Sequence, residues 1–215
     1  MHTVRASMLD WRDQNNGACG QCSKYENQFG GRKMNFNIIV CGVGGQGVVS
    51  SSNVVALAAF KQGLDVMKYE TRGMAQQGGT VVSHVRIGDD VKTPIIREGC
   101  ADLLIAFEPL EAIRYLNLLN VEGKLLASTH PIKVLGYPKL GDLYGELESH
   151  GAELVDASIL AKKAGGFIMQ NTVMLGAASR HIPLDEKNIL EAIRETFAKQ
   201  VGVNLKAFEI GKNRK

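Results

Sequence analysis

Runs of apolar residues alternate with amphipathic segments from about Met34 onward. A short β-branched run at residues 37–41 ends in a cluster of glycines. Residues 48–62 then carry the apolar spacing of a helix, which we expect to close at Gly63. The pattern predicts a unit in which a strand, a glycine-rich loop and a helix follow one another.

The next two apolar segments have the two-residue period of strands. We predict strands at residues 65–70 and 80–87, separated by a second glycine-rich stretch. Residues 88–90 read Gly-Asp-Asp, a sequence typical of a tight turn, and an apolar run follows at residues 91–95. We therefore expect residues 80–95 to form a hairpin at one edge of the sheet.

Strand and helix patterns alternate again after residue 100, apart from a stretch at 129–141 that is rich in proline and glycine. Alternation of this kind is typical of a mostly parallel sheet with helices on both faces. The sequence therefore predicts an α/β fold, a three-layer Rossmann-like domain with a mostly parallel sheet and an edge hairpin. The remaining elements are expected as strands at 102–107, 123–128 and 153–156 and as helices at 109–119, 157–164, 168–180 and 185–200.

Composition changes at the same place as the pattern. Residues 1–33 are polar, with no sustained helical or strand period, so we expect them to be an N-terminal extension and residues 34–215 to be the folded domain. The extension is either disordered or foreign to the natural protein. A competing interpretation makes Cys19 and Cys22 half of a metal or iron–sulfur site, but such a site needs about four ligands. We predict no metal site.

The overall charge and the cysteines exclude several classes of protein. The chain has 215 residues, 45% of them hydrophobic, and a formal net charge of +3 spread as single basic residues among acids. Nothing in this distribution points to nucleic acid or membrane binding, and no secretory signal is evident. Four unevenly placed cysteines do not suggest a disulfide framework. We expect a cytoplasmic protein.

The first glycine-rich loop, residues 42–47, fits the G-x-G-x-x-G pattern between a strand and a helix. Glycines there allow a close backbone approach, and free N–H groups at the helix start attract a phosphate. Glu70 even stands about as far beyond the loop as the acid that binds ribose in a dinucleotide fold. Three interpretations stay open: a phosphate-bearing ligand, a nicotinamide dinucleotide, or glycines that only permit close packing.

The second loop, residues 72–79, combines an arginine, two glutamines and three glycines. These polar groups demand partners, and the glycines break a helix, so the segment suits neither a core nor a helix. Arg72 can form a bidentate pair of hydrogen bonds with a carboxylate or phosphate. Gln76 and Gln77 can form hydrogen bonds with a ligand or with a partner's backbone. The alternative is a polar loop that pins the hairpin or a subunit interface.

Together the two loops resemble a known family. Cys41 to Val48, Tyr69 to Gly79 and Val82 to Gly88 are similar to the gamma-type domain of pyruvate and 2-oxoacid:ferredoxin oxidoreductases, and residues 169–177 resemble that family's helix near the C-terminus. The details favour the indolepyruvate branch, in which the domain is a separate small subunit. The resemblance covers about residues 34–200.

The resemblance implies oxidative decarboxylation of an aryl 2-oxoacid such as indolepyruvate. Coenzyme A accepts the acyl group, and ferredoxin accepts the electrons. Thiamine diphosphate and the 4Fe-4S clusters belong to a large alpha subunit of the family, so this chain is expected to hold no cofactor and to be inactive alone. We assign no catalytic residue. The residues expected to face a cofactor or an interface are Gly42, Gly44, Gly45, Gln46 and Gly47, then Arg72, Gly73, Met74, Gln76, Gln77, Gly78 and Gly79, and Asn171.

Two alternatives remain at the level of sequence. A free-standing NAD(P)-dependent oxidoreductase would use the first loop and Glu70, but the chain offers no Tyr–Lys pair typical of dehydrogenases and only one small domain. A non-catalytic nucleotide-binding protein on the same fold is also compatible with the sequence. Among other candidates, His84 is expected to be a half-buried structural residue, and Cys41 a small buried apolar one.

Overall fold

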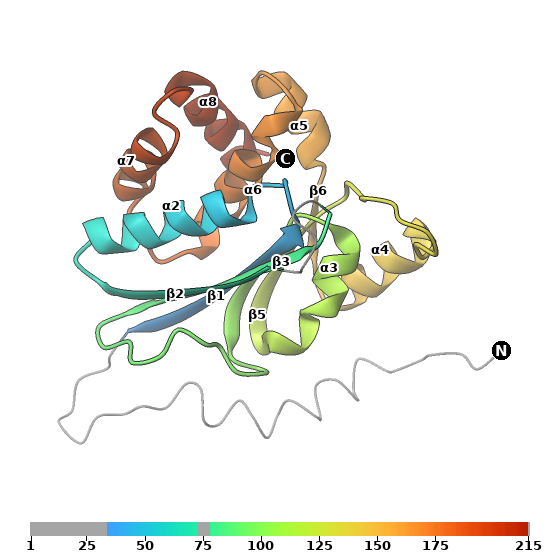
Figure 1. The fold of residues 1–215 in the computed structure, drawn as a ribbon, viewed down its shortest axis with the longest axis horizontal. Helices are drawn as coiled ribbons and strands as arrows, with labels where there is room; N and C mark the ends of the chain where they lie inside the picture. The colour runs from blue at the N-terminus through green and yellow to red at the C-terminus, as the bar shows by residue number, and fades with distance from the viewer. Residues whose placement is uncertain (1–33, 73–77, 215) are drawn as a thin grey trace.

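A computed structural model describes residues 34–72 and 78–214, which form a six-stranded sheet between two layers of helices (Figure 1). The strands lie in the order β2-β3-β1-β4-β5-β6. Their bounds are Asn35–Val43 (β1), Asp65–Arg72 (β2), Thr80–Gly88 (β3), Ala101–Ala106 (β4), Leu119–Ser128 (β5) and Glu153–Val155 (β6).

β3 runs opposite to its neighbours. It pairs antiparallel with both β1 and β2, whereas β1 with β4, β4 with β5, and β5 with β6 are parallel pairs. All strands except β3 therefore end at the same edge of the sheet, among the described strands. The predicted α/β fold with a mostly parallel sheet is confirmed. The first glycine-rich loop lies at the carboxyl edge, where ligands bind in such folds, and so do Arg72 and Gly79 at the two ends of the second.

The predicted hairpin is wrong in its second strand. The edge hairpin is made of β2 and β3, while residues 91–95 form no strand. Pro94 lacks an N–H and disfavours a ladder there. The segment instead packs below the sheet, where Val91 and Ile96 are buried and the Ile96 N–H donates to Nδ1 of His84 over 3.2 Å. His84 is thus structural, and its burial lowers the pKa of the imidazole.

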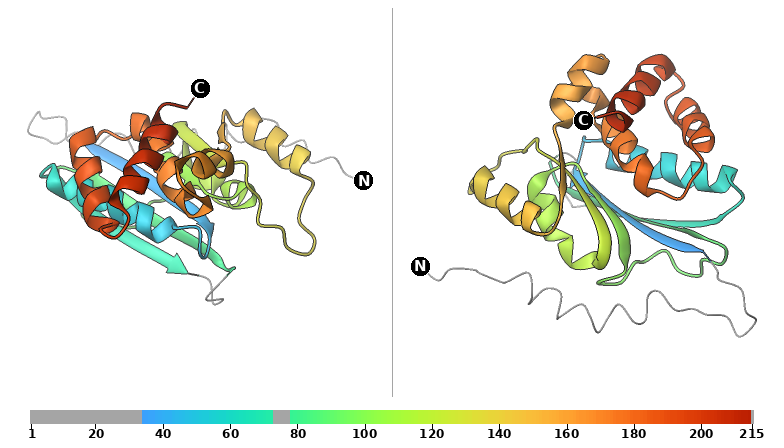
Figure 2. Two further views of the ribbon diagram at one scale, coloured as in Figure 1. Left: turned by 90° about the horizontal axis from the view of Figure 1, so that it is seen from above. Right: turned by 180° about the vertical axis from the view of Figure 1, so that it is seen from behind.

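Two apolar cores lie on the two faces of the sheet because strand residues alternate between them. Ile38 and Val40 of β1 join the core under one helical layer, and Ile39 and Cys41 join the core under the other. The first layer holds α2 (Val48–Lys61), α5 (Ala157–Ala164), α6 (Gln170–Ala178), α7 (Glu186–Thr196) and α8 (Val201–Lys212), and the second holds α3 (Pro109–Arg114) and α4 (Leu140–Ser149), as the rear view in Figure 2 shows.

Several helix bounds differ from the sequence prediction. α3 ends at Arg114, and β5 begins at Leu119, because the chain passes through a short 3-10 turn, Leu116–Leu118, between them. α4 was not predicted, since prolines and glycines dominate the segment before it. The helix predicted at 185–200 ends at Thr196, and a second helix, α8, follows it. A 3-10 turn, Phe167–Met169, precedes α6, and another, Ser179–His181, follows it.

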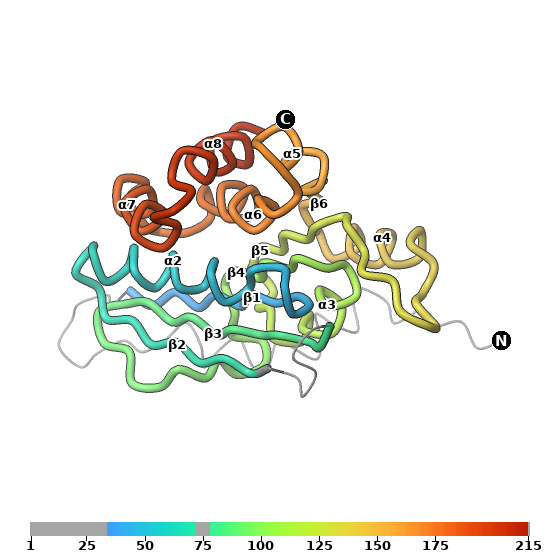
Figure 3. The backbone as a smooth tube through the Cα atoms, turned by 45° about the horizontal axis from the view of Figure 1, so that its top comes forward, coloured from blue at the N-terminus to red at the C-terminus, as the bar shows by residue number. Residues whose placement is uncertain are grey.

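α6 and α8 touch through their backbones. A Cβ at Gly176 of α6 would lie 2.1 Å from the carbonyl oxygen of Phe208, and a Cβ at Gly211 of α8 would lie 2.0 Å from that of Val173. Only glycine permits so close a crossing. Figure 3 shows α6 and α8 next to each other in the same helical layer as α2.

Candidate ligand-binding site

The first glycine loop turns sharply between β1 and α2. Gly45 and Gly47 have φ angles of 99° and 84°, in the left-handed region that glycine enters without strain. A Cβ at Gly47 would lie 2.6 Å from Nδ2 of Asn171, so this glycine is also required for space. The fold thus brings two residues of the predicted site into contact, although they are separated by 124 positions in the chain.

Gln46 holds the loop in shape. Its Oε1 accepts a hydrogen bond from the Val43 N–H over 2.7 Å, and its Nε2 donates to the carbonyl oxygen of Phe107 over 2.9 Å. The side chain therefore ties the loop to the end of β4. Both ends of the amide are used within the chain, so Gln46 positions the loop, whatever else it contacts.

The N-terminus of α2 is open toward this loop. No side chain caps it, and its first turn has no acidic residue. The helix hydrogen bonds begin with the Ser51 N–H, which donates to the carbonyl oxygen of Gly47 over 3.0 Å, so the preceding N–H groups have no acceptor within the helix. Free N–H groups and the helix dipole favour an anion at this point.

The two glycine loops are joined by a backbone hydrogen bond. The Gly44 N–H donates to the carbonyl oxygen of Gly79 over 2.8 Å, just beyond the β1–β3 pair Val43–Thr80. Gly78 has a φ of 84°. Arg72 ends β2 at the same edge, and the positions predicted at Gly73, Met74, Gln76 and Gln77 lie outside the described residues.

A cavity of about 810 Å³ opens beside the first loop, between the carboxyl edge of the sheet and the first helical layer. Its size suits a small-molecule ligand. Gly42 lies behind the loop, packed against Phe107 and Val48. The described lining residues are Gly44, Gly45, Gln46, Gly47, Ser50, Phe107, Ser128, His130, Ile132, Phe167, Ile168, Met169, Gln170, Asn171, Met174, Phe197, Gln200 and Asn204.

Neutral polar groups connect part of the cavity wall. The Thr172 hydroxyl donates to Oδ1 of Asn204 over 2.6 Å and lies 3.4 Å from Oδ1 of Asn171. Nδ2 of Asn204 donates to the carbonyl oxygen of Gln200 over 2.9 Å. Asn171 is 8% exposed, and its amide oxygen lies beside the Thr172 hydroxyl, so the amide belongs to the polar part of the cavity wall.

The lining contains one titratable side chain among its described members, that of His130. Its ring lies edge-on to Phe167, with 4.9 Å between the ring centroids and 75° between the planes. Neither His130 nor Phe167 was predicted as a site residue from the sequence. Ser128 and His130 could have been predicted from the sequence. They lie at the end of the parallel strand β5 and just beyond it, and therefore at the carboxyl edge. Phe167 and Asn204 could not, since only the packing of α8 against α6 brings their segments to the cavity.

A group of buried acids lies on the other side of the joined loops. Glu108, 2% exposed, caps α3 and accepts hydrogen bonds from the Tyr137 hydroxyl and, over 3.3 Å, the Ile132 N–H. Burial, and then the hydrogen bond to Glu108, raises the pKa of Tyr137. The bond therefore anchors the loop that follows β5.

Glu111 lies one turn further along α3. Its Oε1 accepts hydrogen bonds from Arg114 over 2.9 Å and Thr80 over 3.2 Å, whereas its buried Oε2 has no hydrogen-bond partner among the described residues. Burial raises the pKa of the Glu111 carboxyl. It also raises the pKa of the Cys41 thiol, with the nearby Glu111 and Glu108 adding to the effect, so this cysteine is a poor nucleophile.

The strand order argues against a nicotinamide dinucleotide. In the Rossmann dinucleotide-binding fold the strand carrying the ribose-binding acid lies directly beside the first strand. Here β3 lies between β1 and β2, and Glu70 of β2 contacts Lys68 on the edge strand. Glu70 is therefore one strand too far from the glycine loop for that role.

Neither a metal centre nor a membrane span is found in the part of the chain that the structure describes. No three His, Cys, Asp or Glu side chains of residues 34–72 and 78–214 are grouped as metal ligands. None of the described helices has the length and apolar character needed to cross a bilayer.

Comparison with known proteins identifies the family. The model of the pyruvate ferredoxin/flavodoxin oxidoreductase family matches residues 37–214. The chain belongs to this family. The resemblance drawn from the two glycine loops is thereby confirmed.

Curated relatives point to one branch. The indolepyruvate oxidoreductase subunit IorB of Archaeoglobus fulgidus is 43% identical over 192 residues, which cover 84% of this chain and 95% of that protein. The common gamma subunit of the pyruvate/ketoisovalerate oxidoreductases of Thermococcus kodakarensis is 33% identical over 175 residues, or 78% of this chain and 90% of that subunit. Greater identity to the first agrees with the indolepyruvate branch.

Solved structures share the fold. A keto/oxoacid ferredoxin oxidoreductase gamma subunit from Geobacter sulfurreducens superposes with a TM-score of 0.65 at 24% identity, over 82% of this chain and 96% of that one. A 2-oxoglutarate:ferredoxin oxidoreductase from Magnetococcus marinus, with 2-oxoglutarate, coenzyme A and succinyl-CoA bound, gives 0.62 at 22% identity. That match covers 83% of this chain but 30% of the other, so the same fold occurs within a much longer polypeptide.

Proposed function

We propose that this chain is the small subunit of a heteromeric, cytoplasmic 2-oxoacid:ferredoxin oxidoreductase that acts on indolepyruvate or related aryl pyruvates. In the overall reaction the bond between the carboxylate and the carbonyl carbon breaks, and carbon dioxide leaves. The sulfur of coenzyme A forms a thioester with the acyl carbon, two electrons pass to ferredoxin, and the thiol proton is released. The choice of aryl pyruvates rests on the similarity to IorB subunits.

The observation that carries the proposal is the cavity at the open N-terminus of α2. Its wall offers backbone N–H groups, the Ser50 hydroxyl and the amide of Asn171, and its described lining includes no carboxylate that would repel an anion. These groups fit the phosphates of coenzyme A, whose highly charged end needs donors without competing acids. Apolar side chains such as Met169, Met174 and Phe197 suit the uncharged parts of the same ligand.

The chemistry itself is assigned to the large alpha subunit, which would carry thiamine diphosphate and the 4Fe-4S clusters. When bound there, thiamine diphosphate would supply carbanion chemistry at the oxoacid, and the clusters would supply electron transfer. The role of this chain is to bind and orient coenzyme A and to exclude water from it. Asn171 and the first glycine loop, including Gly47, would hold the phosphates of coenzyme A in place. The thiol would then enter the partner's site in a single orientation.

The test is co-expression of the chain with the large subunit under strict anaerobiosis. The readout is coenzyme A-dependent reduction of a viologen dye by indolepyruvate, phenylpyruvate and pyruvate, with and without this chain. We expect activity only with both chains and a preference for the aryl pyruvates. Full activity of the large subunit alone, or tight retention of NAD by this chain, would contradict the proposal.

A further inference from the structure

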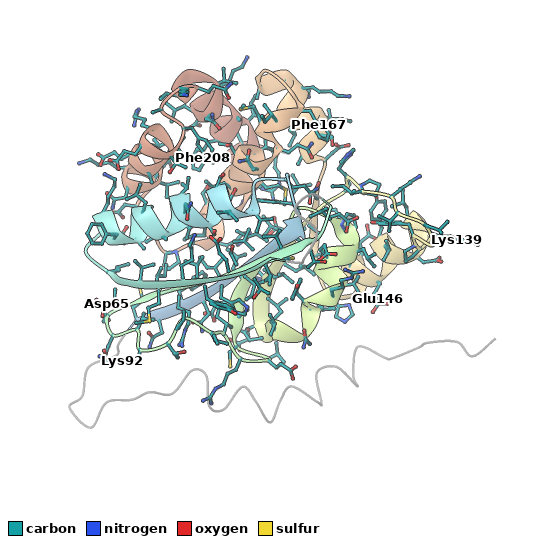
Figure 4. The ribbon with its side chains drawn as sticks, viewed as in Figure 1. Asp65, Lys92, Lys139, Glu146, Phe167 and Phe208 are labelled. Carbon is teal, nitrogen blue, oxygen red and sulfur yellow. The ribbon has the colours of Figure 1, made fainter. Side chains whose placement is uncertain are left out.

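Large apolar side chains are exposed beside the cavity and on the loop after β5 that lines part of it. Phe167 and Ile168, which also line the cavity, are 51% and 74% exposed. Val134 and Leu135, which follow the cavity-lining Ile132 on the loop after β5, are 61% and 105% exposed. These four residues are called the rim. Figure 4 shows Phe167 at the end of the helical layer nearest the loop before α4.

The two halves of the rim are fixed relative to each other. The edge-on ring contact between His130 and Phe167 joins the loop after β5 to the 3-10 turn before α6. Further along the loop, the Tyr137 N–H donates to the carbonyl oxygen of Val134 over 3.1 Å, and Gly136 has a φ of 78°. A tight turn therefore presents Leu135 at its tip, and Figure 2 shows this loop projecting beyond the helices.

The turn is anchored at its base. Glu108 accepts hydrogen bonds from the Ile132 N–H and the Tyr137 hydroxyl, one on each side of Val134 and Leu135. Turns favour Gly, Pro, Asn, Asp and Ser, and Leu135 is none of these. An anchored turn that holds a leucine entirely in water is better explained by a partner that covers it.

The chemistry of the cavity indicates which partner this is. A thiol bound here must meet its acyl donor, and the described lining holds a single titratable side chain, so the reacting group has to arrive from outside. Phe167 and Ile168 line the cavity and are exposed, so a route past them leads from solvent into the cavity. In the Magnetococcus marinus enzyme the matched region is 30% of a longer chain, which agrees with a fold that is covered by other protein.

We propose that the rim is the docking surface for the large alpha subunit, which presents a predominantly apolar patch to it and closes the cavity at its mouth. This inference rests on the proposed function. The rim would bury four apolar side chains at the centre of the contact, and central apolar anchors carry much of the affinity of an interface.

The experiment compares rim variants with a matched control for binding to the purified large subunit. Leu135→Asp and Ile168→Asp each place a charge on one half of the rim. Phe60→Asp makes the same kind of change at a 67% exposed phenylalanine near the far end of α2. Thermal melting checks that all three chains are folded, and biolayer interferometry gives the dissociation constants.

We expect each rim variant to bind the large subunit at least about tenfold more weakly, because an apolar contact is lost and a charge is buried. Phe60→Asp should bind like the wild type. Unchanged binding by both rim variants, or equal weakening by the control, would show that the rim is not the docking surface. The proposed function would remain intact. No binding by the wild-type chain would overturn both, and a rim-dependent homodimer would assign the surface to a second copy instead.

Discussion

The backbone N–H of Gly44 donates to the carbonyl oxygen of Gly79 over 2.8 Å, so the first glycine-rich loop is bonded to the last residue of the second, directly before β3. This contact follows from the antiparallel insertion of β3, which starts beside the end of β1. A ligand that orders the first loop therefore acts on the start of β3 as well. The Gly44 N–H is also occupied, which leaves Gly45, Gly47 and the first turn of α2 as the donors for an anion.

Gly47→Ala should weaken both folding and ligand binding. The change combines a left-handed φ with a clash against Asn171. Gly63→Ala is the matched control, since its φ is 81° and a Cβ there would meet nothing within 4 Å. The backbone term should cost each variant about 1–2 kcal/mol, and the clash should cost Gly47→Ala about 1–3 kcal/mol more. Urea denaturation measures both; equal losses would show that the contact with Asn171 relaxes freely.

For coenzyme A, the same pair of variants separates local from global effects. Calorimetric titration should show binding to Gly63→Ala at nearly the wild-type affinity. Binding to Gly47→Ala should be at least about tenfold weaker, because the phosphate donors move with the loop. Wild-type affinity in Gly47→Ala would place the ligand elsewhere.

Gln46→Glu should destabilise the loop by about 1–3 kcal/mol. The carboxylate can still accept from Val43, but it has no proton for the carbonyl oxygen of Phe107, which is then left without its donor. Gln200→Glu introduces the same charge at the same cavity on an exposed side chain. Its unfolding free energy should stay within about 0.5 kcal/mol of the wild-type value. Similar losses of unfolding free energy in both variants would mean that the added charge is responsible, and not the loss of the hydrogen bond to Phe107.

Gly211→Ala should cost about 3 kcal/mol or more in unfolding free energy, because its Cβ would meet the Val173 backbone at 2.0 Å. Gly202→Ala lies on the same helix with nothing within 4 Å of its Cβ. That change should be neutral or stabilise the chain by up to about 1 kcal/mol. A tolerated Gly211→Ala, measured by thermal and urea denaturation, would show that α8 can move away from α6.

Glu111 should make folding less favourable as pH rises. Burial raises its pKa above the ordinary value of 4.5, so the folded chain keeps a proton that the unfolded chain has lost. The unfolding free energy contributed by this group therefore falls from pH 4.5 upward, until the raised pKa is passed. Glu111→Gln should flatten the decline, whereas Glu148→Gln, at an exposed site on α4, should not.

Denaturation curves between about pH 4.5 and pH 7 test this expectation. The pKa of Asp102 is also raised by burial, so part of the wild-type slope will remain in Glu111→Gln. The difference between the wild type and the variant isolates the Glu111 contribution. An unchanged slope would mean that Arg114 and Thr80 compensate the carboxylate fully.

Local signals were enough to predict the strand, glycine loop and helix around residues 37–62, and the short helix Ala157–Ala164, because period and terminating glycines agree there. They failed for residues 91–95, because the apolar residues there pack against the sheet in a segment without regular secondary structure. The edge hairpin depends on pairing β2 with β3, and no local pattern reveals that β3 enters between β1 and β2.

The candidate site was predicted in part for the same reason. The first loop carries its own signature, and Asn171 is conspicuous as an amide in an apolar helix. Glu70 matched the spacing of a ribose-binding acid, yet strand order moves it away from the loop. His130, Phe167 and Asn204 come from three separate segments that only the assembled layers bring together. The domain boundary at residue 34 and the contacts of the second loop remain predictions.

The backbone contact between α6 and α8 limits how this site could evolve toward other ligands. Asn171 lies on α6 and Asn204 on α8, and the backbones of these helices are in contact at Gly176 and Gly211. Small substitutions therefore cannot move the two helices apart to widen this wall of the cavity without destabilising the fold. Room for a bulkier or differently shaped molecule must therefore come from the mouth, where loops carry the side chains. Within this family, changes in ligand preference should accumulate around His130 and Phe167, while the two glycines of the crossing stay fixed.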